Sequence, residues 1–381
     1  MQFTRKGTIA IASAMLALFV LSCALRAQDS AATQSIPSPA SANFIHDTGQ
    51  SLELLDPFQP GKVVPHWRSG VLIQPEGGFP NSNFTLYDRV GNQRDVEVTI
   101  PGAEVAGIHD VDLDGAGNIY LSGAADDSDG RHVFFIARIA KADGKTTVVR
   151  TGTYAVSHLC VNPDGNVWTL GLRPDQTSAN PAYHMLRLYS FDKGRLQGYL
   201  PNTSILVSSK KWHHPPFGVG DRFNDTLQGI SPQIASCTGS TVEVNSPETD
   251  EWMHLDVASG KLDRWKIDSS AITAKGTQMS YGFAYLPAKA AQEGGGTAYL
   301  VTSDYRGPNR SLFILRLLSD KLSWQDVSTQ VGMDKPERIY SIYGADGQFL
   351  VHHGGGVGRS LHWSRPEPSE LDKVKDSATP Q

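Results

Sequence analysis

Short stretches in which apolar and polar residues alternate run through most of the chain, and they come in pairs separated by tight turns. Each pair consists of a period-2 strand, a turn of Gly, Asp or Lys, and a second strand, which is the pattern of a β-hairpin. Five such pairs are alike: residues 84–98, 135–149, 185–199, 252–266 and 312–326. The pattern predicts an all-β protein.

A second type of hairpin alternates with the first and repeats along the chain. Residues 108–123 (IHDVDLDGAGNIYLSG) align without a gap on 156–171 (VSHLCVNPDGNVWTLG), 48 positions later, and 339–354 follows the same pattern. Two hairpins per unit of about fifty residues give four strands, and so small a sheet needs neighbours to bury its faces. Radial repetition of such sheets is a β-propeller.

Counting the units predicts a six-bladed β-propeller of four-stranded antiparallel blades. The blades are expected at about 63–102, 103–152, 153–201, 226–270, 278–330 and 336–365. The last unit has three clear strands and lacks a fourth. Residues 51–55 (SLELL) precede the first unit and have no other partner. We therefore expect this N-terminal strand to close the ring as the outer strand of blade six.

The start of the chain is predicted to be a signal peptide, residues 1–27. Arg5 and Lys6 precede an apolar run, residues 9–21, that is too short to span a bilayer comfortably. Residues 28–45 and the end of the chain, 366–381, are small and polar, which is typical of a flexible linker and a loose tail. The propeller domain is expected at 46–365.

Two processing routes remain open. Cleavage after Ala27 releases a soluble protein, whereas a lipobox that ends at Cys23 makes that residue a lipidated N-terminus. Either route places the protein outside the cytoplasm, in the periplasm or the extracellular space. Cleavage at Ala27 leaves only Cys160 and Cys237. The repeat register does not place these two side by side, and the sequence leaves their pairing open.

The charge balance narrows the range of partners. The chain has 381 residues, with 34 basic and 39 acidic side chains and a net charge of -5. An acidic protein without a basic patch repels nucleic acid. We therefore expect a monomer with no nucleic-acid partner and no membrane span, whose ligand is a small molecule, a glycan or another protein.

The candidate binding residues gather on one face of the predicted ring. We call it the loop face, because the long connections from second to third strands and from blade to blade leave the sheets there. The inner strands begin at this face, and the insertion at 202–228 adds an aromatic segment that resembles a lid or docking element. The candidates are His109, Asp110, His158, Trp212, His213, Tyr281, Arg338, Tyr340 and His352.

Three alternating carboxylates in the second unit form a candidate metal site. Asp110, Asp112 and Asp114 resemble the start of a loop that binds a divalent cation such as calcium, although Leu121 occupies the place of the final acidic ligand. The other interpretation is structural, because Asp114 aligns with Asn162 in the first turn of its unit. Both interpretations remain open at this point.

The turns Asp114–Tyr120 and Asp164–Trp168 resemble those of extracytoplasmic six-bladed propellers of the NHL and SMP-30/gluconolactonase type. The resemblance covers most of 63–365 at the level of the fold. Members of the gluconolactonase kind are lactone hydrolases with a divalent metal, which implies a Glu in an E-G-P segment, an Asn in a P-N-G segment and an Asp. Glu76-Gly77-Gly78 is the nearest match to the first segment, and the second is missing.

Three functions follow from these patterns. The preferred one is an exported binding module that uses the loop face. The second is a metal-dependent hydrolase of lactonase type, with His109, Asp110 and His158 near the metal. The third is a structural interaction protein tethered to a surface through Cys23. The sequence contains no serine-hydrolase elbow, phosphate-binding loop or zinc-binding helix motif.

Overall fold

The computed structural model describes residues 45–53, 60–75, 83–172, 184–201, 233–246, 250–275, 278–287, 296–304, 310–317, 322–329, 339–353 and 360–366. All of these belong to a unit that runs from Asn43 to Gln381. The predicted signal peptide, the tail after 366, and the candidates Trp212, His213 and Arg338 lie outside the described residues. Among the described residues the helix α3 (Ser270–Thr273) is only four residues long, and no helix there could cross a membrane.

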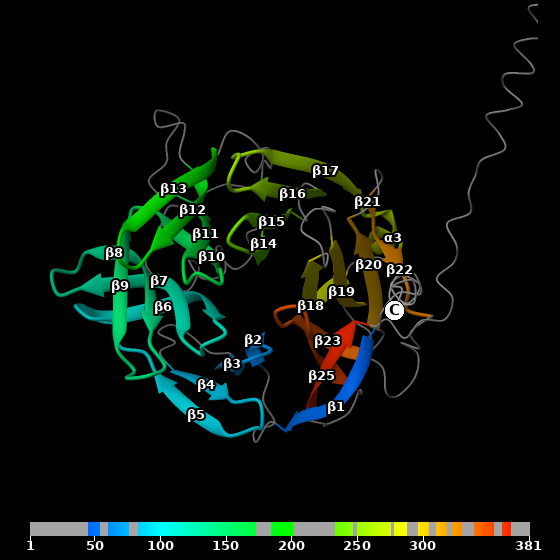
Figure 1. Cartoon of the computed structure of the whole chain (residues 1–381), viewed down its shortest axis with the longest axis horizontal. Coiled ribbons are helices and arrows are strands. Elements are labelled where there is room, and N and C mark those ends of the chain that lie inside the picture. The colour runs from blue at the N-terminus through cyan, green and yellow to red at the C-terminus, as the bar shows by residue number, and fades with distance from the viewer. Residues whose placement is uncertain are drawn as a thin grey trace, which may run out of the picture. The chain divides into compact units, whose positions relative to one another are not determined.

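The described strands form six antiparallel sheets arranged as the blades of a ring (Figure 1). This confirms the predicted six-bladed β-propeller. In each blade the first strand lies innermost, and the following strands succeed one another outward. Blades one to three comprise β2 (Pro60–His66), β3 (Gly70–Pro75), β4 (Asn83–Tyr87), β5 (Gln93–Glu97); β6 (Ala103–Leu113), β7 (Ile119–Asp127), β8 (His132–Ile139), β9 (Thr146–Gly152); β10 (Ala155–Val161), β11 (Val167–Leu172), β12 (His184–Ser190) and β13 (Gly194–Pro201).

Blades four to six follow the same order, with one addition. They comprise β14 (Gln233–Cys237), β15 (Thr241–Ser246), β16 (Glu251–Asp256), β17 (Leu262–Asp268); β18 (Gln278–Pro287), β19 (Gly296–Asp304), β20 (Arg310–Arg316), β22 (Gln325–Asp326); β23 (Ile339–Gly344), β24 (Phe349–His353), β25 (Ser360–Pro366) and β1 (Ile45–Glu53). The addition is β21 (Leu322–Ser323), which pairs in parallel with β17 and so ties the chain of blade five to the edge of blade four.

The N-terminal strand closes the ring, as predicted. β1 pairs antiparallel with β25, and Leu52 lies opposite Leu361 in the core. The strand begins at Ile45, earlier than the predicted start at Ser51. Its first half escapes detection in the sequence because the register shifts between Asp47 and Gln50 and Gly49 has a φ of 76°, which together interrupt the alternation of apolar and polar residues.

The core consists of the apolar faces between neighbouring blades. One buried cluster joins Phe134 of blade two, Trp168 and Leu170 of blade three, and Val242 and Val244 of blade four. Each blade alone would leave these side chains in water, and burial of each large one contributes about 2 kcal/mol. The ring is therefore held together by contacts between blades as well as within them.

Candidate functional site

Every inner strand carries an extra residue that interrupts its pairing with the second strand. The antiparallel order places the start of each inner strand, the end of the second strand and the start of the third at this face. The pairing with the second strand shifts by one residue in all six blades, which makes each extra residue a β-bulge. The extra residues are Gly61, His109, Ser157, Ala235, Tyr281 and Tyr340.

The bulges explain where the sequence candidates lie. His109, Tyr281 and Tyr340 occupy bulge positions, and Asp110 and His158 directly follow one. A bulge turns one side chain away from the regular alternation of its strand, and bulges are common next to active sites. All five inner-strand candidates therefore belong to one structural level of the ring.

Two glycines allow the inner strand to approach its neighbour at this level. An added Cβ at Gly123 would lie 2.1 Å from the carbonyl oxygen of Gly107, and one at Gly171 would lie 2.2 Å from that of Ala155. No larger residue fits either position without moving the backbone. The glycines occupy equivalent positions in the 48-residue repeat, so both units provide the space that the bulge needs.

At the joint between blades two and three, two predicted residues come together. The Nδ1 atom of His158 lies 3.9 Å from Oδ2 of Asp110. The same carboxylate oxygen accepts the backbone N–H of Leu159 at 2.8 Å, and Asp112 accepts the backbone N–H of Val161 at 2.8 Å. These two carboxylates therefore connect the inner strand β6 to the inner strand β10.

His109 does not lie at an open mouth, contrary to the expectation from the sequence. Its side chain is buried, and Nδ1 donates a hydrogen bond of 3.1 Å to the carbonyl oxygen of Val156 in the next blade. The ring also lies 6.4 Å from that of Phe134. Burial lowers the pKa of His109 to about 4, so the imidazole is neutral at neutral pH. The bulge therefore directs the His109 side chain into the contact between blades two and three.

Asp114 serves the turn that follows β6. Its carboxylate accepts the backbone N–H groups of Ala116 and Asn118, the side-chain amide of Asn118 and the hydroxyl of Tyr120. Asn162 has the same role 48 positions later, where its side-chain oxygen accepts two backbone N–H groups of its own turn. The equivalence of Asp114 and Asn162 is the one that the repeat predicts.

The three carboxylates of the suggested calcium site do not converge. Asp110 and Asp112 accept from two different amides of β10, and Asp114 accepts from its own turn. Across the described ranges, no group of three or more His, Cys, Asp or Glu side chains is placed to hold a metal ion. Glu76, the nearest match to a lactonase ligand, lies outside those ranges.

A second group of candidates comes together between blades five and six. Arg310 is 8% exposed, and its guanidinium carbon lies 4.1 Å from the centre of the Tyr340 ring. The rings of Tyr340 and His352 meet edge to face with centroids 5.1 Å apart. We call these three side chains the Arg310 cluster. Tyr340 and His352 were predicted from the sequence. Arg310 was not, because its contact with Tyr340 crosses from one blade to the next.

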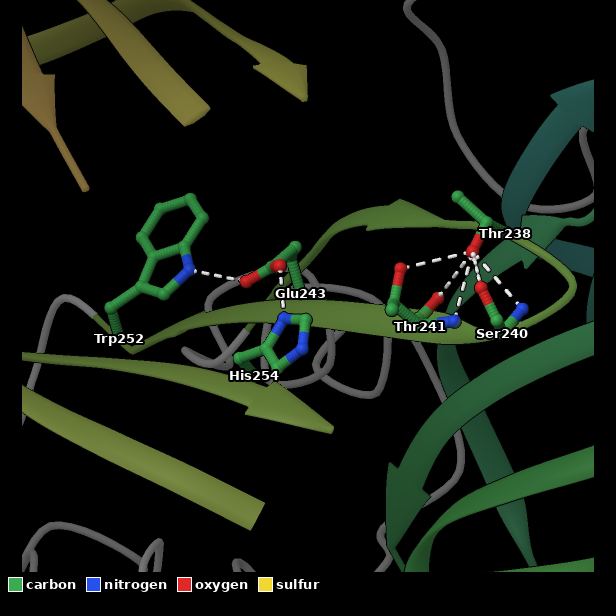
Figure 2. Close-up of polar contacts among 6 residues, drawn as sticks. All are labelled: Thr238, Ser240, Thr241, Glu243, Trp252 and His254. Atoms are coloured by element: carbon green, nitrogen blue, oxygen red, sulfur yellow. Dashed lines mark hydrogen bonds and ion pairs between the residues drawn. The ribbon is translucent and has the colours of Figure 1, made fainter. Parts of the chain in front are cut away.

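A buried carboxylate in blade four also escapes sequence reasoning. Figure 2 shows the indole of Trp252 and the imidazole of His254 directed at the two oxygens of Glu243. The indole N–H donates at 2.6 Å, and Nδ1 of His254 lies 2.5 Å from the other oxygen. Trp252 packs against Tyr285 of blade five, with ring centroids 5.2 Å apart. The available signal is a Glu between two valines in the strand, opposite a His.

The turn beside this group is closed by a side chain as well. In Figure 2 the hydroxyl oxygen of Thr238 accepts the backbone N–H groups of Ser240 and Thr241, at 3.1 and 2.8 Å. A threonine here does what Asp114 does in blade two, so the turn that joins the first two strands keeps its shape with a different residue. These contacts serve the fold.

The pair formed by Glu243 and His254 predicts a loss of stability at alkaline pH. The hydrogen bond to Glu243 raises the pKa of His254 above 6.5, and Asp263 and Asp256 act in the same direction. A raised folded-state pKa gives stability that is complete below 6.5 and is lost as the pH rises through the raised value. Glu243, Asp263 and Asp256 are the charged groups facing this imidazole.

The measurement is chemical unfolding of the wild type and of His254→Gln, which keeps a donor but cannot titrate. We expect the advantage of the wild type to shrink between about pH 6 and about pH 9. An advantage of constant size across that range would contradict this account of the pair.

Cys160 and Cys237 form a disulfide, although the repeat register does not place them side by side. Cys160 lies near the end of β10 and Cys237 ends β14, so the bridge joins the inner strands of blades three and four. Alignment of one repeat on another compares positions within blades. It does not show which inner-strand ends meet across the joint between two blades, and that is where this bridge lies.

Comparison with known proteins finds solved structures with a similar fold but assigns the chain to no family. No family model matches the chain, and no curated protein matches it. A Bacteroides fragilis protein classed as exported is 9% identical, with a TM-score of 0.48 over 87% of this chain and 98% of that one. The soluble aldose sugar dehydrogenase of Escherichia coli is 13% identical, with a TM-score of 0.41 over 83% and 99%.

The major allergen Mala s 1 of Malassezia sympodialis is 10% identical, with a TM-score of 0.39 over 83% of this chain and 96% of that one. Likenesses this distant carry no argument about activity. The assignment of a β-propeller fold therefore depends on the six sheets of this structure. The finer resemblance to NHL and SMP-30/gluconolactonase propellers stays a prediction.

Proposed function

We propose that this chain is an exported β-propeller that binds its ligand at the loop face, in the sector of blades five and six. The observation that carries the proposal is the Arg310 cluster. It brings a cation, a phenol and an imidazole together at the bulge level, on rigid strands of two blades. Rigid scaffolds commonly present binding groups in this way, beside loops that adapt to the ligand.

Export is supported by two independent features. The sequence predicts a signal peptide at residues 1–27, and the structure contains the Cys160–Cys237 disulfide. Disulfides persist in oxidising compartments and are rare in the cytosol. The hydrolase alternative receives less support, because the carboxylates of Asp110 and Asp112 are already engaged by backbone amides.

The test is a thermal-shift panel of monosaccharides, sugar acids and amino acids against the purified protein. We expect at least one compound to raise the Tm of the wild type and to lose this effect in Tyr340→Ala, because that change removes the ring at the centre of the cluster. Val90→Ala is the matched control, since Val90 is 82% exposed on the β4–β5 turn at the opposite face. A stabilising compound that depends on Val90 rather than Tyr340 would contradict the proposal.

A further inference from the structure

Arg187 is a buried cation in the middle of β12, the third strand of blade three. It is 7% exposed, and among the residues that the structure describes no carboxylate forms an ion pair with it. The buried Glu251 of blade four shows the usual situation, because nitrogens of Arg264 and Lys266 lie 2.8 and 2.9 Å from its carboxylate oxygens. A charge taken out of water without a counterion is costly. A buried cation of this kind therefore indicates an anion that the protein does not supply.

The guanidinium of Arg187 has few acceptors. Its Nε–H donates to the carbonyl oxygen of His184 at 2.9 Å, and Nη1 lies 3.4 Å from the hydroxyl oxygen of Tyr189. These contacts leave the Nη2 amino group and one N–H of Nη1 without an acceptor among the described residues. The Tyr189 hydroxyl accepts from Nη1, so its own proton is available for donation. Donors of Arg187 and Tyr189 thus lie side by side.

Aromatic rings hold the guanidinium in place. Its carbon lies 3.7 Å from the centre of the Tyr154 ring. Tyr154 is itself fixed, because its hydroxyl donates to the carbonyl oxygen of Met185 at 2.6 Å and its ring stacks on that of Tyr189, with centroids 6.5 Å apart. A guanidinium held in this way loses little side-chain freedom when it binds a ligand. Its planar fork of donors matches two oxygens of an oxyanion.

The site lies close to the surface, at the loop-face end of β12. His184, whose carbonyl oxygen accepts from Arg187, begins this strand and is exposed. Burial lowers the pKa of His184 below 6.5, and the positive charges of Arg187 and Arg195 lower it further. The electrostatic potential at this end of the strand is therefore positive, which attracts an anion from solution.

We propose that Arg187 and Tyr189 form a binding site for a small oxyanion, which accepts hydrogen bonds from the guanidinium and from the phenol. The bound anion supplies both the negative charge and the acceptors that this part of blade three lacks. Carboxylates and phosphates share this chemistry, and the experiment below distinguishes them. The site is separate from the Arg310 cluster and does not depend on the function proposed for that cluster.

The test is calorimetric titration of the wild type at pH 7 with sodium acetate and with sodium phosphate, at an ionic strength held constant with sodium chloride. We expect saturable binding of at least one of the two anions, and the tighter one identifies a carboxylate or a phosphate as the preferred group. Arg187→Gln should weaken that anion about ten- to a hundredfold, the range for hydrogen bonds to a charged group.

A second variant and a control accompany Arg187→Gln. Tyr189→Phe keeps the stacked ring and removes only the hydroxyl, and it should weaken the anion roughly fivefold, as expected for one neutral hydrogen bond. Arg316→Gln is the matched control, because it removes the same charge from an exposed residue at the end of β20 in blade five. This control should bind the anion as tightly as the wild type.

Binding that is weakened in Arg187→Gln and retained in Arg316→Gln supports the proposed site. Three results would overturn it: no binding of either anion to the wild type, undiminished binding in Arg187→Gln, and equal weakening in Arg316→Gln. Because Arg187 is buried, the melting curve of its variant is measured first. If that variant does not fold, Tyr189→Phe decides in its place, and an unchanged affinity there overturns the proposal.

Discussion

Replacing Cys160 and Cys237 with serine is expected to lower the free energy of unfolding by about 4 kcal/mol. The bridge closes a loop with a sequence separation of 77 and joins the inner strands of blades three and four. Without it the unfolded chain gains conformational freedom, and the gain grows with the length of the loop. Denaturant titration of the wild type and the double variant measures the difference.

Single variants provide the control for this prediction. Cys160→Ser and Cys237→Ser should each lose as much as the double variant, because one cysteine cannot form the bridge. A reducing agent should destabilise the wild type and leave the double variant unchanged. A loss below about 1 kcal/mol, the size of a typical surface or small core change, would show that the bridge does not stabilise the protein.

Acidification from pH 6.5 to about 4 is expected to cost the folded protein about 3 kcal/mol through His109 alone. Burial holds the pKa of this imidazole at about 4, whereas the unfolded chain takes up the proton below the ordinary value of 6.5. A lowered folded-state pKa gives stability that is present above 6.5 and is lost as the pH falls towards 4. The effect has the opposite direction to that of His254, which operates above 6.5.

The variant His109→Asn separates this effect from general acid denaturation. Asparagine retains a donor for the carbonyl of Val156 but has no proton to gain. We expect its unfolding free energy, measured by urea titration at several pH values, to fall less steeply than that of the wild type in this range. Parallel slopes for the two proteins would mean that His109 is not buried in its neutral form.

Much of the fold could be predicted from the sequence because repetition is visible in one chain. The alignment of 108–123 on 156–171 contains the strands, the turn and the glycine that the bulge requires. The unpaired strand near residue 51 predicted the closure of the ring, although the irregular pairing around Gly49 hid its first half. These features depend on local pattern, which a sequence displays directly.

The candidate site was predicted only in part, because its contacts cross between blades. The repeat placed Tyr340 and His352 at the loop face, and the structure brings them together. Arg310 was missed, since nothing in its own strand indicates that it will stack on a ring of the next blade. His109 was misjudged for a related reason: alternation along a strand does not show which way a bulged side chain turns.

The most direct test of binding at blades five and six is a crystal structure of the protein grown with a compound that stabilises it in the thermal-shift panel. Our account predicts this compound on the loop face, in contact with the side chain of Tyr340. A structure with the compound bound only at another face would contradict it.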